Sequence, residues 1–153
     1  MNQKSILVAS SGGGHWIQLS RLIPSLSGMD VHAAVVDPDS AKNFDFNFRS
    51  ISSIADFNRL SIYRGVAASF KIFGLLRKIR PSVVISTGAA PGLLVILIAK
   101  IFFGSKCLWI DSIANTKRLS YSGRVAQLIR VTVYCQWEEV ASSSSSEFHG
   151  RVI

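Results

Sequence analysis

Short apolar runs alternate along this chain with longer segments in which apolar residues recur at helical spacing. The runs predict five buried strands, over residues 5–9, 31–36, 83–85, 107–110 and 131–135. A further short strand over 48–51 is favoured by alternating phenylalanines, Phe44, Phe46 and Phe48. Buried strands that alternate with helices indicate an α/β fold, a Rossmann-like parallel sheet with helices on both faces.

The segments between the predicted strands have helical periodicity. We expect a helix that ends near Gly28 and three more over residues 58–79, 92–103 and 123–129. Residues 37–40, Asp-Pro-Asp-Ser, predict a turn. A chain of 153 residues is long enough for a proper core, and we expect one domain over residues 1–153.

The first apolar run ends in serines and glycines that are followed by a histidine. These residues are Ser10, Ser11, Gly12, Gly13, Gly14 and His15. A helix pattern follows, so a ligand can approach the glycine backbone, and free N–H groups at the helix start attract negative charge. We therefore expect a phosphate or diphosphate site, in which His15 binds phosphate or acts as a base. The alternative is a tight turn with a solvated histidine.

Two further turns follow predicted strands, at residues 87–92 and 111–116. The carboxyl ends of parallel strands meet at one edge of a sheet, where open α/β sheets bind their ligands. We expect these turns to converge with residues 11–15, and their convergence is a stronger indication of a site than any one of them.

Charge and composition narrow the choice of partners. Seventeen Lys and Arg residues stand against nine Asp and Glu, which gives a net charge of +8, and 48% of the residues are hydrophobic. This balance favours nucleic acid, an anionic membrane or phosphorylated substrates, and an apolar surface that a partner or a membrane covers. We expect no secretory signal and no membrane-spanning helix. Cys107 and Cys135 read as reduced, buried thiols.

Five blocks of residues, in order along nearly the whole chain, are similar to one known family. They are SSGGGH at 10–15, VISTGAAPG at 84–92, IDS at 110–112, KRLSYSGR at 117–124 and QWEE at 136–139, and residues 148–153 also fit. The chain resembles the PssD type of polysaccharide-biosynthesis glycosyltransferase subunit. That type is similar to the membrane-anchoring subunit of the two-part UDP-GlcNAc transferase of N-glycan assembly and to the N-terminal half of MurG.

The resemblance implies the N-terminal half of a GT-B glycosyltransferase, carried as a separate polypeptide. This half would dock peripherally at the cytoplasmic face of the membrane and receive a polyprenyl-diphosphate-linked sugar as acceptor. A smaller partner subunit would hold most contacts to the UDP-sugar, so the chain would be an enzyme only as a complex. Transfer in this fold would be direct and metal-free, with no cofactor beyond the UDP-sugar donor substrate.

Within that cleft, His15 and Asp111 are the candidate catalytic residues. His15 would face the acceptor diphosphate or the attacking hydroxyl, and Asp111 would orient His15, bind a sugar hydroxyl or act as a helix N-cap. The candidate diphosphate-binding residues are Ser11, Gly12, Gly13, Gly14, Thr87, Gly88, Ala89, Ala90 and Arg118. Close packing of a strand on a helix explains the small residues at 87–90 equally well, and a solvated face explains Arg118.

Two positions depart from the family pattern. Glu-Ser-x-Ala-Arg of the N-glycan subunits reads Asp-Ser-Ile-Ala-Asn at 111–115, so the phosphate contact of that arginine is not carried over. Gln-Trp-Pro-Glu reads Gln-Trp-Glu-Glu at 136–139, which we expect to change only a loop.

The predicted helix over 58–79 is apolar around most of its circumference and gathers basic residues towards its C-terminal end. This pattern fits anionic lipid headgroups and predicts membrane contact at Arg64, Lys71, Arg77, Lys78 and Arg80. The alternative is a core helix whose basic residues complement the helix dipole.

A second class of function stays open, namely a non-catalytic basic module that binds nucleotides or nucleic acid. The sequence contains no interleaved aromatic and basic residues and no nucleic-acid-binding module, so nucleic acid is not the expected partner. Salt-dependent binding to a duplex or a single strand separates the two classes.

Overall fold

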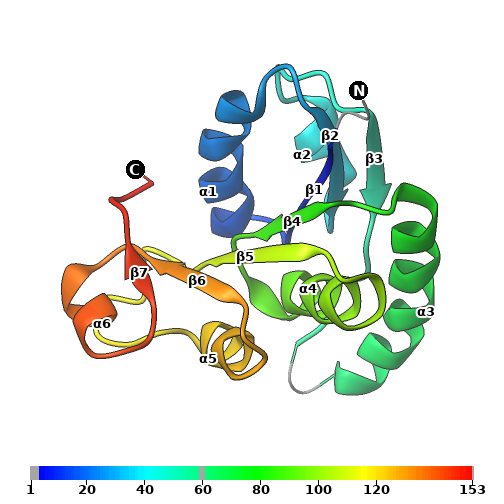
Figure 1. Cartoon of the computed structure of the whole chain (residues 1–153). Helices are drawn as coiled ribbons and strands as arrows, with labels where there is room; N and C mark the ends of the chain where they lie inside the picture. Colours follow the sequence, from blue (N-terminus) through cyan, green and yellow to red (C-terminus); the bar gives the residue numbers. More distant parts are fainter. Residues whose placement is uncertain (1–3, 59–60, 153) are drawn as a thin grey trace.

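The computed structural model describes residues 4–58 and 61–152, which form a seven-stranded parallel sheet flanked by helices (Figure 1). The order across the sheet is β3-β2-β1-β4-β5-β6-β7. The strands are β1 (Ser5–Ser10), β2 (Asp30–Val35), β3 (Ser50–Ser53), β4 (Val83–Ser86), β5 (Lys106–Ile110), β6 (Thr132–Cys135) and β7 (Glu147–Phe148). The helices are α1 (Gly14–Leu22), the 3-10 helix η1 (Ile23–Leu26), α2 (Pro38–Lys42), α3 (Ile62–Ile79), α4 (Ala89–Phe103), α5 (Tyr121–Leu128) and α6 (Glu138–Ser142).

The chain starts in the middle of the sheet and builds outwards in two directions. From β1 it proceeds through β2 to β3, then returns across the sheet to pair β4 with the other side of β1, where Ala9 lies opposite Ser86. At such a reversal the connections leave on opposite faces, and a crevice opens beyond the carboxyl ends of the strands. The turns after β1 and β4 are therefore neighbours, although His15 and Thr87 are 72 positions apart in the sequence.

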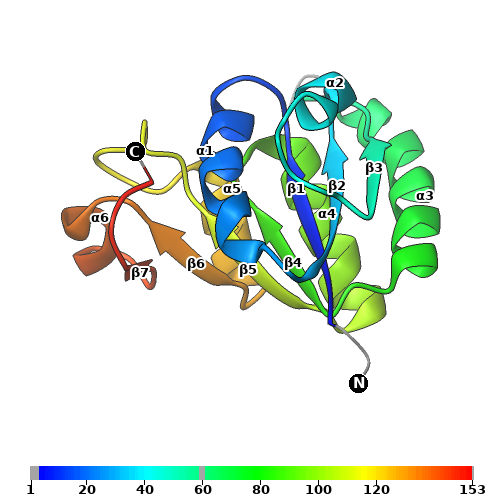
Figure 2. The same cartoon turned by 90° about the horizontal axis from the view of Figure 1, so that it is seen from above.

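Helices cover both faces of the sheet, as the sequence predicts, but they cover them unequally. α1, η1 and α2 lie on one face, and α3, α4, α5 and α6 lie on the other (Figures 1 and 2). The larger core packs α3, α4 and α5 against the sheet around Trp109, and the smaller core packs α1 around Trp16 and Leu19. The smaller core extends only as far as β4, at Val83 and Ile85.

The five strands predicted from apolar runs are confirmed to within one residue at each end. The further strand predicted over 48–51 lies two residues later, at Ser50–Ser53. The alternating phenylalanines explain the shift, because the tilted rings of Phe46 and Phe48 contact each other with centroids 4.9 Å apart and pack on the smaller core from a loop. The sequence pattern does not reveal β7 or α6, which are two and five residues long.

All of the helix predictions need correction at their bounds. The first helix ends at Leu22 and is followed by η1 as far as Leu26, rather than continuing to near Gly28, and α5 spans Tyr121–Leu128 rather than 123–129. Residues 37–40 start the short helix α2, because Asp37 accepts a hydrogen bond from the Asp39 N–H and Pro38 stands in the first turn. α4 begins three residues earlier than predicted, at Ala89, so its N-terminus lies within the turn. α3 begins at Ile62 rather than 58, and residues 59 and 60 of the prediction lie outside the described residues.

Within the described part of the chain, no helix combines the length and the hydropathy that a membrane span requires. Cys107 and Cys135 are buried and unpaired, as the sequence predicts. Burial raises the pKa of the Cys107 thiol to about 11, so this group is a neutral part of the core near neutral pH.

Candidate functional site

The turn between β1 and α1 exposes a glycine-rich backbone. Gly13 has a φ of 63°, a conformation that favours glycine. A Cβ built on Gly12, Gly13 or Gly14 would meet no other atom within 4 Å, so the space beside this backbone is open. α1 starts at Gly14, and the first N–H groups of a helix have no partner within it. The turn therefore has the features of an anion-binding site at a helix N-terminus.

The turn between β4 and α4 brings a second helix N-terminus to the same place. α4 starts at Ala89, directly after Gly88. Ala89 has a φ of 61°, which is rare for a residue with a Cβ and concentrates at functional sites. Gly92 lets α4 lie close to its strand, because a Cβ there would approach the Ser86 hydroxyl to 2.2 Å. Close strand–helix packing thus accounts for this last glycine.

His15 joins the two turns by a pair of reciprocal hydrogen bonds. Its Nδ1 lies 3.1 Å from the carbonyl oxygen of Thr87, and the Thr87 hydroxyl donates to the carbonyl oxygen of His15 at 2.7 Å. The ring packs against Gly88, where a Cβ would come within 2.1 Å of Nδ1. A carbonyl oxygen only accepts, so Nδ1 carries the proton and Nε2 of the neutral ring is free to act as an acceptor.

The half-buried His15 side chain lines a cavity of about 360 Å³ beyond the carboxyl ends of the strands. The cavity lies between the second turn and the segment that follows β5. Its lining residues are His15, Thr87, Gly88, Ala89, Trp109, Asp111, Ser112, Ala114, Asn115, Ser120, Tyr121 and Ser122. We call this cavity the site cavity. The structure therefore confirms that the three predicted turns, at residues 11–15, 87–92 and 111–116, converge at one edge of the sheet.

Asp111 has its carboxylate committed to its own loop. One oxygen accepts from the indole N–H of Trp109 and the hydroxyl of Ser120, and the other from the side chain of Asn115 and the backbone N–H of Ser120. Only 1% of Asp111 is exposed. The histidine is oriented by the Thr87 carbonyl rather than by Asp111, and the N-cap of α5 is Ser120. Asp111 thus holds the wall of the site cavity in place.

Of the candidate diphosphate-binding residues, Thr87, Gly88 and Ala89 line the site cavity, and Gly13 and Gly14 line no hollow at this edge of the described part of the chain. Ser11, Gly12, Ala89 and Ala90 line a second hollow of about 430 Å³, which shares Ala89 and Ser122 with the site cavity. Phe57 and Asn58, before α3, form part of its wall. The two hollows are therefore adjacent, at the N-termini of α1 and α4.

Arg118 is exposed and lines neither hollow. The sequence did not single out the polar lining residues Ser112, Asn115, Ser120, Tyr121 and Ser122 as site residues. Asn115 had been noted only as the loss of an arginine. Asn115 lies four residues after Asp111, in the loop that follows β5. This spacing could have indicated that the Asn115 amide reaches back to the Asp111 carboxylate.

The five basic residues predicted to contact a membrane are all exposed: Arg64, Lys71, Arg77, Lys78 and Arg80. Large apolar side chains are exposed beside them on α3 and the end of α4: Tyr63, Val66, Phe70, Phe73, Ile101 and Phe102. Phe70 is 79% exposed, and the rings of Phe73 and Phe102 meet edge to face with their centroids 5.6 Å apart. The apolar residues of α3 thus serve two purposes, one part facing the core and the other facing outwards.

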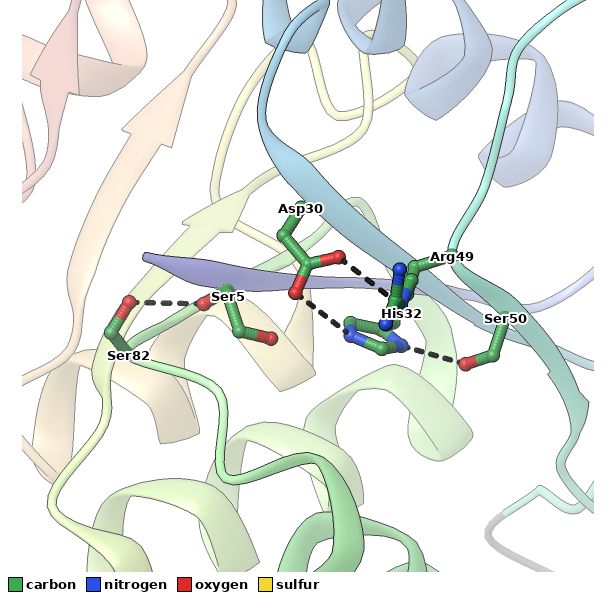
Figure 3. Close-up of polar contacts among 6 residues, drawn as sticks. All are labelled: Ser5, Asp30, His32, Arg49, Ser50 and Ser82. Carbon is green, nitrogen blue, oxygen red and sulfur yellow. Dashed lines mark hydrogen bonds and ion pairs between the residues drawn. The ribbon is translucent and has the colours of Figure 1, made fainter. Parts of the chain in front are cut away.

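A separate polar cluster lies at the amino end of the sheet (Figure 3). The imidazole of His32 contacts the Ser50 hydroxyl at 2.7 Å through Nδ1 and the Asp30 carboxylate at 3.7 Å through Nε2. Arg49 approaches the other oxygen of Asp30 to 3.9 Å. These contacts connect β2 with β3 at the edge opposite the site cavity.

Comparison with protein-family models and with curated proteins finds no match. Solved structures do match. The chain superposes on MurG of Acinetobacter baumannii with a TM-score of 0.76 and 14% identity, covering 96% of this chain and 45% of that one. UDP-GlcNAc 2-epimerase of Methanocaldococcus jannaschii gives a TM-score of 0.66 at 16% identity, covering 88% and 40%. The corresponding epimerase of Neisseria meningitidis, bound to UDP-GlcNAc, gives 0.66 at 12%, covering 88% and 40%.

These similarities establish the fold: a half-size, Rossmann-like domain of the kind found in MurG and the UDP-GlcNAc 2-epimerases. The chain spans less than half the length of each of these structures.

Proposed function

We propose that this chain is the acceptor-side subunit of a two-subunit UDP-sugar glycosyltransferase. Its acceptor would be a polyprenyl-diphosphate-linked sugar of exopolysaccharide or capsule biosynthesis. The observation that carries the proposal is the meeting of two helix N-termini and one half-buried histidine at the carboxyl edge of the sheet. The similarity of the fold to MurG, together with the sequence blocks that resemble PssD-type subunits, supports this choice among the uses of such a site.

The diphosphate of the acceptor fits the N-termini of α1 and α4. Both helices direct unpaired N–H groups and the positive ends of their dipoles to this region, and glycines leave the backbone accessible at Gly12 and Gly13. Among the described residues, no arginine or lysine lines either hollow, so within this part of the chain backbone groups rather than side-chain cations would hold the phosphates.

His15 is suited to act as the base. The Thr87 carbonyl keeps the proton on Nδ1, so Nε2 can accept the proton of the acceptor hydroxyl. The hydroxyl oxygen forms a bond to the anomeric carbon of the donor sugar as the bond from that carbon to the UDP oxygen breaks. UDP leaves with the bonding electrons, and the proton resides on Nε2 of His15. The two hydrogen bonds between His15 and Thr87 hold the ring in position for this transfer.

The donor half of the cleft would come from a smaller partner subunit that binds the UDP-sugar. The site cavity and its neighbour lie at the edge where the second domain of a two-domain enzyme of this fold would face them. The chain spans 45% of the MurG chain, which fits one of two such halves.

Peripheral attachment to the cytoplasmic leaflet completes the proposal. The basic residues of α3 would contact anionic headgroups, and the exposed aromatic residues Phe70 and Phe102 would enter the interface between headgroups and acyl chains. α3 starts beside the second hollow, so a membrane-held acceptor would find the site close to the bilayer surface.

The proposal is tested with the tagged chain purified from its own host, alone and with the protein that co-purifies. UDP release and transfer of label are measured with a panel of UDP-sugars and a polyprenyl-diphosphate-linked sugar in anionic vesicles. We expect turnover by the complex only. Full turnover by the lone chain would exclude the two-subunit arrangement.

Binding provides a second test that does not need the partner. The lone chain should bind vesicles that contain the diphosphate-linked sugar more tightly than matched vesicles without it. Gly13→Val should remove this difference, because a β-branched side chain at a φ of 63° distorts the turn and blocks close approach of phosphate. If diphosphate adds nothing to binding, or if duplex DNA binds as tightly at the same salt, the acceptor role is wrong.

A further inference from the structure

We propose that the site cavity takes the sugar ring of the acceptor, and that the diphosphate linked to this sugar lies outside it, in the second hollow. Asn115 and Ser122 would select the sugar through its hydroxyl groups. This assignment rests on the proposed function, because it concerns the same acceptor, and it adds the direction in which the acceptor lies and two residues that recognise it.

The wall of the site cavity presents hydrogen-bond acceptors. The side-chain nitrogen of Asn115 donates to the Asp111 carboxylate at 3.0 Å. A carboxylate only accepts, so this contact fixes the orientation of the amide and leaves the Asn115 oxygen for a ligand. Within the described residues, that oxygen has no hydrogen-bond partner. Nε2 of His15 is a second acceptor, because Nδ1 carries the proton. The cavity therefore suits a ligand that donates hydrogen bonds.

A diphosphate does not meet that requirement. Its ionised oxygens only accept hydrogen bonds, whereas each hydroxyl of a sugar can both donate and accept. The lining of the site cavity also contains no arginine or lysine in the part of the chain that the structure describes. The groups that line this cavity thus fit a sugar ring better than a phosphate.

The buried charge of Asp111 has the same consequence. Its carboxylate is 1% exposed and accepts from neutral groups, and the residues that the structure describes form no ion pair with it. A buried negative charge without a cation is weakly screened, so it opposes a second negative charge in the adjoining cavity. A neutral sugar meets no such repulsion.

The size of the site cavity and the rest of its lining suit one sugar ring. Its volume of about 360 Å³ is near the lower end of the range for small-molecule sites, about 300–1,000 Å³. Tyr121, which is 52% exposed, adds an aromatic ring, and Ser122 adds a hydroxyl group. That hydroxyl makes no hydrogen bond within the described residues, so it is available to a ligand.

The second hollow is the better place for the diphosphate. It shares Ala89 and Ser122 with the site cavity, so a sugar and its phosphates can span the two. Its lining includes Ser11 and Gly12 of the glycine turn, where the backbone is open and α1 begins nearby. Asp56 also lines this hollow, but Asp56 is exposed, so solvent screens its charge.

The hydrocarbon chain of the acceptor would then leave towards α3. Phe57 and Asn58 border the second hollow just before α3, and Tyr63 is the first of the exposed apolar side chains along that helix. Sugar, diphosphate and lipid would follow one path from the site cavity to the surface assigned to the membrane. The attacking hydroxyl would remain beside Nε2 of His15.

The test uses water-soluble probes and the full chain without its partner. Each probe is a farnesyl diphosphate diester whose second ester group is glucose, galactose, N-acetylglucosamine or, as the control of equal charge, methyl. Isothermal titration calorimetry measures each Kd, and the ratio of the methyl probe to a sugar probe gives the sugar increment. We expect an increment of roughly tenfold or more for at least one sugar, because its hydroxyls pair with buried acceptors.

Two variants assign the increment to the site cavity. Asn115→Ala and Ser122→Ala should each remove most of it and leave the affinity for the methyl probe unchanged. Asn43→Ala and Ser145→Ala are the matched controls, since both residues are exposed and line neither hollow. Circular dichroism establishes that each variant is folded. Ser122→Ala breaks no hydrogen bond of its side chain, so it serves if Asn115→Ala does not fold.

UDP-glucose, UDP-galactose and UDP-GlcNAc test whether the cavity takes the sugar of the donor instead. We expect no binding of these compounds that either variant changes. If the methyl probe binds and no sugar adds affinity, the sugar assignment is wrong and the diphosphate site stands. If no farnesyl probe binds, the proposed acceptor role fails together with the assignment. An increment that survives both variants, or UDP-sugar binding that either variant abolishes, would also overturn it.

Discussion

The two ends of the sheet each hold a histidine, an aspartate and a hydroxyl group, yet only one end has the features of a functional site. At the amino end, His32 has one ring nitrogen on Ser50 and the other near Asp30, and its side chain is 12% exposed (Figure 3). At the carboxyl end, His15 uses one nitrogen on the Thr87 carbonyl and lines a cavity beside two helix N-termini.

This comparison shows that residue types alone do not identify a site. The residues of the amino-end cluster belong to β2, β3 and the position just before β3, so the regular geometry of the sheet fixes them. His15 follows a strand, where the chain leaves the sheet and a ligand can reach it. The distinguishing features are an accessible ring nitrogen and a local positive field from helix ends.

The largest expected difference between the two ends is in catalysis. On the proposed function, His15→Ala should lower the turnover of the complex by about 10²–10⁴-fold, because the proposed base is lost. His32→Ala is the matched control and should leave turnover unchanged per folded molecule. A loss of acceptor affinity with turnover intact would make His15 a phosphate ligand instead. Equal effects of both variants would remove the distinction between the two ends.

A smaller effect is expected from the wall against which His15 packs. Gly88→Ala places a Cβ 2.1 Å from Nδ1 of His15, so the ring must move off the Thr87 carbonyl. We expect turnover to fall by roughly 10–10²-fold, as misplacement of a catalytic group does. Gly74→Ala in α3 is the control, since a Cβ there meets no other atom within 4 Å. Full activity of Gly88→Ala would show that the position of the ring is unimportant.

The smallest expected difference is in stability. Asp111→Asn replaces an oxygen that accepts from the Asn115 side chain and the Ser120 N–H by an amide group that donates, and it leaves donors facing one another in a buried site. We expect a loss of about 2 kcal/mol, or roughly 4–8 °C in Tm. Asp30→Asn, at the partly exposed amino end, should cost less than about 1 kcal/mol. Thermal melting by circular dichroism measures both, and the reverse order would contradict the roles given to the two carboxylates.

The apolar runs predicted the strands because hydrophobic burial in a central parallel sheet leaves a continuous signal. The signal was absent for β7, which has only two residues, both exposed, and for α2, where the cap of Asp37 decides the structure. At the site, the glycine turn and His15 were recognisable from local spacing. The reciprocal bonds with Thr87 were not, because they join residues 72 positions apart.

The role of Asp111 was also beyond the sequence. An aspartate at a strand end looks the same whether its oxygens face a substrate or its own loop. In the structure four donors, contributed by Trp109, Asn115 and Ser120, face these oxygens, and their approach depends on the path of residues 112–120. Sequence patterns therefore located the edge of the sheet and left the roles of its residues to tertiary contacts.

The central position of β1 has a consequence for biosynthesis. β1 lies between β2 and β4, and β4 is the later of the two in the sequence. β4 starts just after Ser82, which is 77 positions after Ser5. At about 5–20 residues per second, the ribosome needs roughly 4–15 s to supply that stretch. During this interval the first strand of the nascent chain has an open, apolar edge, and the two turns of the site have not yet met. We therefore expect the newly made protein to need protection from aggregation until the β4–α4 unit has emerged.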